Sequence, residues 1–143
     1  MPYTPKRQEE FTLFRNIPVV AHAHVYLSPP KHVWPHLELS ANWPNRVHSR
    51  FLELDGVRWH YQQLGNGPEV LLVHGTGGSA HSWAVCAEAL SKKFTVIVTD
   101  LPGHGFTFVP TAVERARNIY SINGMAGALQ QLLDALRIGR GKL

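Results

Sequence analysis

A glycine-rich segment directly after an apolar run is the part of this chain whose residue types point most clearly to chemistry. The run Val70–Val73 leads into His74, Gly75, Thr76, Gly77 and Gly78. Glycine has no Cβ, so the backbone of such a turn can approach a ligand closely. Backbone N–H groups placed in this way stabilise negative charge that develops on an oxygen. The segment therefore predicts an oxyanion-binding loop, with the N–H of Thr76 as a donor.

A dinucleotide site is a second interpretation of the same residues. Gly75, Gly77 and Ala80 spell G-x-G-x-x-A, and Asp100 lies 20 residues beyond Ala80. That spacing suits an acid that binds a ribose hydroxyl. A dinucleotide-binding domain usually begins with its fingerprint strand. In this chain two predicted antiparallel strands precede the glycine-rich segment, which favours the oxyanion loop. The alternative nevertheless stays open on spacing alone.

The elements that must position these loops follow one another in a simple order. A turn signal at Asp55-Gly56 predicts a β-hairpin. A strand, a helix and a second strand come next, and they predict a right-handed parallel βαβ unit. Ser121 can cap a later helix that runs to about Ile138. The expected segments are strands 50–54, 57–64, 69–74 and 94–99, helices 82–93 and 121–138, and a long loop 101–118.

The fold class expected from this order is α/β. Ligands of such sheets bind at the carboxyl ends of the strands. These ends carry 74–79 and 100–105, so both loops should meet at one edge. Cys86 falls on the predicted apolar face of the first helix, where we expect a small core residue.

Motifs in a particular order resemble one protein family. His74-Gly75 is followed about 25 residues later by Asp100-Leu101-Pro102-Gly103-His104-Gly105, which is similar to the α/β-hydrolase superfamily. The wider order resembles the magnesium-chelatase accessory protein branch of bacteriochlorophyll biosynthesis over about residues 41–138. The segments that carry this resemblance are 43–46, 49–51, 56–60, 74–77, 81–83, 100–107 and 124–126.

The resemblance implies a serine-hydrolase type of site. It implies that Thr76 donates its backbone N–H in a loop formed with His74, Gly75, Gly77 and Gly78. It also implies a pocket near Trp83, His104 and Phe106, and magnesium chelatase or a porphyrin as partner. A module that binds a porphyrin or a partner protein without catalysis is a further alternative.

The nucleophile half of such a site is missing from this sequence. In the family the serine sits on a G-x-S-x-G elbow, and no such pentapeptide occurs here. The segment 77–81 comes nearest, with His81 in place of the closing glycine. We therefore expect a fold truncated before the nucleophile strand and catalytically incompetent alone. The strand 69–74 would then have an open edge, through which the chain could self-associate.

Composition sets the remaining expectations. The chain has 143 residues and a formal net charge of +4. Its single cysteine excludes a disulfide framework within the chain and a multi-cysteine metal site. Seven of its ten prolines lie in residues 1–44 and all twelve glycines begin at Gly56. We therefore expect a poorly structured extension over 1–40, a domain over 41–138 and a tail over 139–143. The basic residues are too scattered for nucleic acid, no run could span a membrane, and neither a cofactor nor a metal is expected. A cytoplasmic location is expected.

Overall fold

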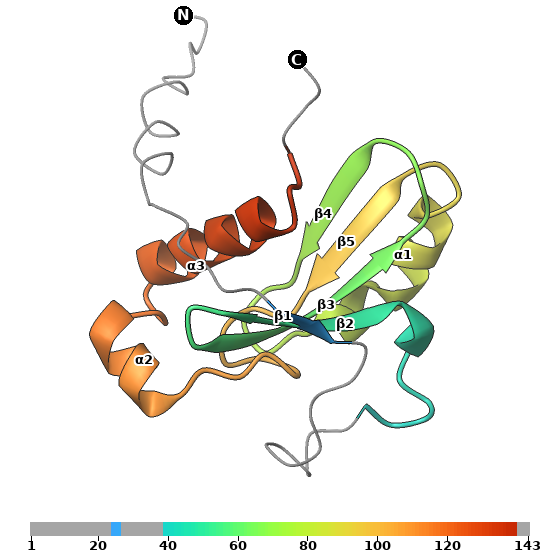
Figure 1. The fold of residues 1–143 in the computed structure, drawn as a ribbon. Helices are drawn as coiled ribbons and strands as arrows, with labels where there is room; N and C mark the ends of the chain where they lie inside the picture. Colours follow the sequence, from blue (N-terminus) through green and yellow to red (C-terminus); the bar gives the residue numbers. More distant parts are fainter. Residues whose placement is uncertain (1–23, 27–38, 140–143) are drawn as a thin grey trace, which may run out of the picture.

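A computed structural model describes residues 24–26 and 39–139 of the chain. Its strands form one five-stranded sheet in the order β1-β2-β3-β5-β4 (Figure 1). Only β4 and β5 are parallel, and the other neighbouring strands are antiparallel. The strands are β1 (His24–Tyr26), β2 (Ser49–Leu54), β3 (Val57–Leu64), β4 (Glu69–Val73) and β5 (Thr95–Thr99).

The hairpin of β2 and β3 forms where the sequence predicts it. Leu54 pairs with Val57, which leaves a two-residue turn. Asp55 and Gly56 in that turn have φ values of 49° and 78°. Positive φ at both central positions is the requirement of a type I′ turn, whose twist matches the twist of the paired strands.

The strand–helix–strand unit is also confirmed. From β4 the chain passes through a 3₁₀ turn η3 (Ala80–Trp83) and helix α1 (Ala84–Leu90) to β5. Glu69 then pairs with Thr95 and Val73 with Thr99, in parallel. The carboxyl ends of β4 and β5 therefore lie at the same edge, as expected for the two loops.

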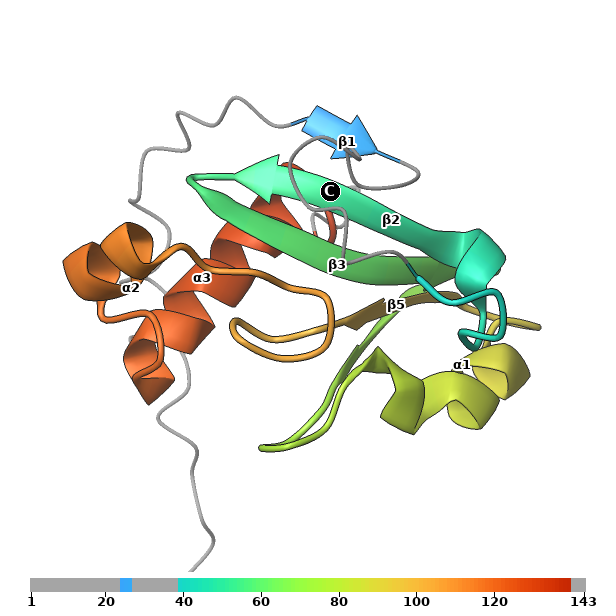
Figure 2. The ribbon, with the colours of Figure 1, turned by 90° about the horizontal axis from the view of Figure 1, so that it is seen from below.

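Two hydrophobic clusters cover opposite faces of the sheet. Trp59 and Tyr61 of β3 lie in a cluster with Leu132 of helix α3 (Ile122–Ala135). Leu64 of β3 faces the opposite side of the strand from Trp59 and Tyr61, and it lies in a cluster with Ala87 of α1. Since side chains of a strand alternate between faces, the sheet is packed on both sides. Figure 2 shows α1 and α3 separated by the strands.

The helices differ from expectation in three respects. The predicted loop 101–118 contains a helix, α2 (Thr111–Arg117), which starts directly after Pro110. Proline is favoured just before or at a helix start because its N–H is not needed there. The first predicted helix is shorter than expected, and Cys86 on it is exposed. The expectation that Cys86 is a core residue is therefore wrong, because Trp83, Ala87 and Leu90 fill the contact with the sheet.

The N-terminal cap of α3 is where the sequence predicts it. The Ser121 hydroxyl oxygen accepts a hydrogen bond from Gly124 N at 3.0 Å. A short strand, β1, lies within the segment 1–40, where no regular element was expected, and it pairs with β2. Residues 1–23, 27–38 and 140–143 lie outside the described residues, so the expected domain bounds stay a prediction. Within the described residues, no helix is long and apolar enough to cross a membrane.

Candidate functional site

The predicted oxyanion loop forms a tight turn at the carboxyl end of β4. Gly78 N donates a hydrogen bond to Gly75 O at 3.0 Å. Gly77, at the third position, has a φ of 77°. A positive φ at this position is the requirement of a type II turn, and glycine adopts it without strain. Thr76 occupies the second position of the turn and is exposed.

The turn is open on the side that a ligand would approach. A Cβ added to Gly75 or to Gly77 would meet no atom within 4 Å. The backbone N–H of Thr76 donates no hydrogen bond to any group in the described part of the chain. The structure therefore brings an accessible, unused N–H donor and two unhindered glycines together in one turn.

His74 anchors the start of the loop, and its ring is not available to a ligand as a general base. Its side chain is buried, and its Nδ1–H donates to Gly75 O at 2.8 Å. Its Nε2 accepts a hydrogen bond from Leu101 N at 3.0 Å. Both ring nitrogens are thus engaged with the backbone, one on each of the two strand-end loops. The ring centroid of His104 lies 5.1 Å from that of His74, and His104 Nδ1 donates to Pro102 O.

Asp100 fastens the far end of the same loop. Its side chain is 0% exposed. Oδ1 accepts a hydrogen bond from Ala80 N at 2.6 Å, and Oδ2 accepts one from Phe106 N at 2.8 Å. Oδ2 also accepts one from His60 Nδ1–H at 2.7 Å.

The carboxylate of Asp100 is held in its charged form. Burial by itself would raise the pKa of Asp100, because it disfavours the charged state. The hydrogen bond and the charge interaction with His60, together with the N–H groups of Phe106 and Ala80, outweigh burial and hold this pKa below its ordinary value. The group is therefore an acceptor of three donors.

This geometry contradicts the dinucleotide interpretation. An acid that binds a ribose must present its carboxylate to the ligand. Both oxygens of Asp100 are instead taken by protein donors in the interior. Gly75, Gly77 and Ala80 have the required spacing, but Ala80 N is one of the donors that Asp100 uses.

The structure adds a buried polar cluster that sequence reasoning missed. Beyond its bond to Asp100, His60 places its Nε2 3.0 Å from Ser49 Oγ. Gln62 Nε2 donates to the same Oγ at 3.0 Å and to Pro44 O at 2.7 Å. Ser49, His60 and Gln62 are all at most 2% exposed. Both ring nitrogens of His60 are thus engaged with buried side chains, Nδ1 with Asp100 and Nε2 with Ser49.

The sequence does contain one signal for this cluster. Arg58, His60 and Gln62 alternate with the apolar residues Val57, Trp59 and Tyr61 along β3. Alternation ordinarily indicates that the polar face meets water. Three polar residues at such spacing in a central strand could also have indicated a buried network, but nothing local distinguishes the two cases.

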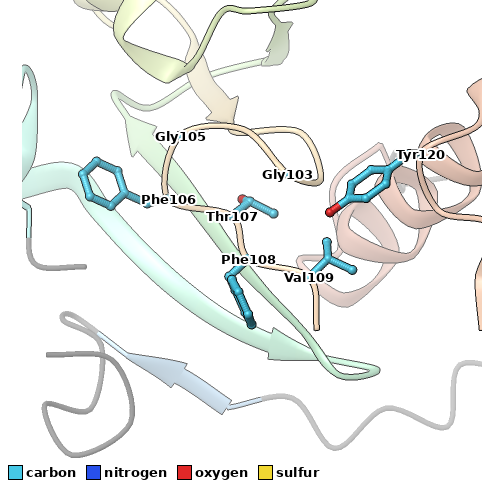
Figure 3. A pocket seen from close by; sticks show the side chains of 7 residues that line it. All are labelled: Gly103, Gly105, Phe106, Thr107, Phe108, Val109 and Tyr120. Atoms are coloured by element: carbon cyan, nitrogen blue, oxygen red, sulfur yellow. The ribbon is translucent and has the colours of Figure 1, made fainter. Parts of the chain in front are cut away.

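The expected pocket of Trp83, His104 and Phe106 stays a prediction. Phe106 lines a cavity of about 230 Å³ with Gly103, Gly105, Thr107, Phe108, Val109 and Tyr120 (Figure 3). Trp83 packs against the cluster around Ala87. His104 lies beside His74, as described above. The cavity is smaller than most ligand sites, which hold about 300–1,000 Å³.

Ser79, the serine nearest to an elbow motif, has a structural position. It is the N-terminal cap of η3, where its side chain accepts a backbone N–H and Ser82 reciprocates. A nucleophilic serine needs a general base within hydrogen-bond reach. Among the described residues, the serine in contact with a histidine is Ser49, which is inaccessible. No group of three or more metal-ligating side chains occurs in that part of the chain.

Comparison with known proteins agrees with the fold and with the order of the motifs. The magnesium-chelatase 30 kDa subunit of Rhodobacter capsulatus is 36% identical over 102 residues, which are 70% of this chain and 34% of that protein. A fluoroacetate dehalogenase of a Burkholderia species is 36% identical over 76 residues, 53% of this chain and 25% of the dehalogenase. The crystal structure of an epoxide hydrolase from Vigna radiata superimposes with a TM-score of 0.56 at 32% identity, over 64% of this chain and 29% of that structure.

The chain thus spans about a third of the magnesium-chelatase subunit and a quarter of the dehalogenase. The likeness to the magnesium-chelatase subunit confirms the resemblance that the motifs indicate. The sequence model of the family described as alpha/beta hydrolase fold matches residues 68–142, which is more than half of the chain. This chain therefore belongs to the alpha/beta hydrolase fold family.

Proposed function

We propose that the turn at Gly75 supplies one oxyanion donor, the backbone N–H of Thr76, to a ligand bound at the carboxyl ends of β4 and β5. The observation that carries this proposal is the unused N–H of Thr76 in an open turn whose two ends are fixed by His74 and Asp100. Donors that are fixed before the ligand arrives cost no reorganisation when charge develops on the oxygen.

The parent role of this chain is that of an α/β-hydrolase-fold factor that acts with magnesium chelatase in bacteriochlorophyll biosynthesis, in the cytoplasm. The support is the 36% identity to the magnesium-chelatase subunit over 102 residues. The ligand of the loop would be a porphyrin or a derivative with a carboxylate or ester oxygen. A porphyrin would have to lie across the loops, because the cavity beside Phe106 is too small to enclose a macrocycle.

Catalysis by this chain alone is not part of the proposal. One oxyanion donor contributes about 10²–10³ in rate, and covalent catalysis also needs a nucleophile with a positioned base. We expect no turnover of p-nitrophenyl acetate above the buffer rate. Turnover that a serine-directed phosphonate abolishes would overturn this expectation.

A pair of substitutions at Thr76 tests the donor directly. Thr76→Pro removes the N–H, and proline is favoured at the second position of a type II turn, so the turn itself should survive. Thr76→Ala removes the side chain and keeps the N–H. We expect Thr76→Pro to weaken binding of protoporphyrin, followed by its absorbance, about tenfold or more, since a hydrogen bond to a charged group contributes about 1.5–3 kcal/mol. Thr76→Ala should bind as the wild type does.

Equal binding by both variants would contradict the role of Thr76. A Trp83→Ala variant would not serve this purpose, because Trp83 packs in the core cluster on the α1 face and its loss would report on folding.

We also infer that copies of this chain associate through β4. Within the described residues β4 pairs with β5 alone, so its other side presents unpaired backbone groups. Unpaired strand edges readily take up another strand.

A further inference from the structure

Ser49, His60 and Asp100 are linked in the same order as the residues of a serine-hydrolase triad, but their role differs from that of a triad. The hydroxyl, the imidazole and the carboxylate are linked in that order by contacts of 3.0 Å and 2.7 Å. A ligand cannot reach Ser49 Oγ, because Ser49 is buried and its oxygen is shared with Gln62. The cluster must therefore act on the protein itself and not on a substrate.

Asp100 joins three separate segments of the backbone. Ala80 N directly follows the oxyanion loop, and Phe106 N belongs to the loop after β5. His60 belongs to β3 and also binds the second loop, because its backbone N–H donates to Thr107 Oγ1 at 2.9 Å. Asp100 is thus a common acceptor for both strand-end loops and for the central strand.

The chain is shaped to admit this carboxylate. A Cβ at Gly105 would overlap the carboxylate oxygens of Asp100, and the φ of Gly105 is 50°. Any other residue at position 105 would therefore be unfavourable for two reasons. Its Cβ would overlap the Asp100 carboxylate, and its backbone would be strained at a positive φ. Aromatic rings of Trp43 and Phe106 lie edge-on to His60 at centroid distances of 6.3 Å and 5.5 Å, which closes the cluster to water.

We propose that Asp100 and His60 are positioning residues that hold the Gly75–Ala80 turn in its binding conformation. Asp100 fixes the end of the turn through Ala80, while His74 fixes its beginning through Leu101. His60 keeps the carboxylate of Asp100 oriented through Nδ1, whereas Ser49 contacts the far nitrogen of the ring, a buried contact that serves stability. This inference rests on the proposed function in so far as the turn serves Thr76 as an oxyanion donor.

Backbone order parameters of the turn test the proposal without any ligand. In the wild type, the amides of Thr76, Gly77 and Gly78 should have values of about 0.85, typical of a rigid backbone. In Asp100→Asn the side-chain oxygen still accepts from Phe106 and His60, but the amide nitrogen then faces the N–H of Ala80, which loses its acceptor, and the order parameters should fall below about 0.6. Glu88→Gln, which neutralises an exposed carboxylate on α1, should leave them unchanged.

Ser49→Ala separates positioning from a general loss of stability. It removes the partner of His60 Nε2 but leaves all three donors of Asp100 in place. We expect this variant to melt at a lower temperature and still to keep the order parameters of the turn at the wild-type level. If the turn loosens equally in Ser49→Ala and in Asp100→Asn at matched distance from their melting temperatures, the cluster is merely structural and the proposal fails.

A wild-type measurement covers the case in which Asp100→Asn does not fold. On acidification, the amide signals of Ala80, Phe106 and Thr76 should shift together, with one midpoint below the ordinary pKa of an aspartate, and the signals of α3 should not follow. Independent movement of these amides would overturn the proposal. These experiments use no ligand, so they test the positioning role even if Thr76→Pro binds protoporphyrin as the wild type does. Likewise, the binding test remains valid if the turn is not held by Asp100.

Discussion

At the scale of single residues, the site depends on how a few polar groups are satisfied. Asp100 was expected at a strand end, and the structure makes it the acceptor of three buried donors. His74 and His104, which invite an assignment as bases, donate to backbone carbonyls. In the described turn, the N–H of Thr76 is among the backbone groups left for a ligand. The proposed ligand contact is therefore made by a backbone N–H, and the side chains of His74 and Asp100 hold that part of the backbone in place.

The lowered pKa of Asp100 makes a prediction about acid stability. A carboxyl whose pKa is lower in the folded state than its unfolded value of about 3.9 stabilises the fold above that value. This contribution is lost as the pH falls through the folded pKa. At neutral pH we expect Asp100→Asn to lower the free energy of unfolding by about 1–3 kcal/mol for each buried N–H that loses its acceptor. The difference from the wild type should stay constant above about pH 5 and shrink below about pH 4.

Urea denaturation between pH 3 and pH 7 measures this difference. The matched control is Glu88→Gln, whose carboxylate is exposed and should show no such dependence. A difference that does not change down to pH 3 would mean that the pKa of Asp100 is the same in the folded and the unfolded protein.

At the scale of elements, local signals place most of the structure correctly. The Asp55-Gly56 turn, the β4–α1–β5 unit and the Ser121 cap all follow from rules that act over a few residues. The helix α2 and the strand β1 escape such rules. The first lies in a segment rich in turn residues, and the second exists through its pairing with β2. An element whose stability comes from its partner cannot be recognised from its own composition.

The free side of β4 makes a prediction about association. Val73, at the end of β4, is 36% exposed. We expect the wild-type chain to form dimers or larger species whose share rises with concentration. Val73→Lys should shift the distribution toward monomer, because a charge at a strand edge opposes pairing with another strand. Light scattering after size-exclusion chromatography measures this shift.

The control for this experiment is Val47→Lys. Val47 is 80% exposed and lies on the 3₁₀ turn η2 (Arg46–His48), outside the sheet. The association proposal is wrong if the wild type stays monomeric at all concentrations.

At the scale of the whole molecule, the sheet has a core on each face. Leu132 of α3 is completely buried against β2 and β3, whereas Ile122 on the same helix is 87% exposed. Both are large apolar residues of one helix, and of the two only Leu132 lies in the cluster with β2 and β3. We propose that both clusters unfold together as one domain over 41–138.

A matched pair of truncations in α3 tests this arrangement. Leu132→Ala should cost about 2–5 kcal/mol of unfolding free energy, because it leaves a cavity in the core. Ile122→Ala should change it by less than about 0.5 kcal/mol, as surface substitutions do. Both are measured by urea denaturation followed by circular dichroism. A second transition in Leu132→Ala would mean that the two faces are not one cooperative unit.

The amino-acid sequence by itself determined the β2–β3 hairpin, the β4–α1–β5 unit, the turn at Gly75 and the family, because these depend on spacing within short segments. The resemblance of the motifs led to the same family as the comparisons. Only the tertiary structure decided what Asp100 does, since its partners Ala80, Phe106 and His60 come from three segments that meet in space. It also decided that Cys86 is exposed and Ser49 is buried. Burial and hydrogen-bond partnership are properties of packed surfaces, and no local pattern along one strand or helix contains them.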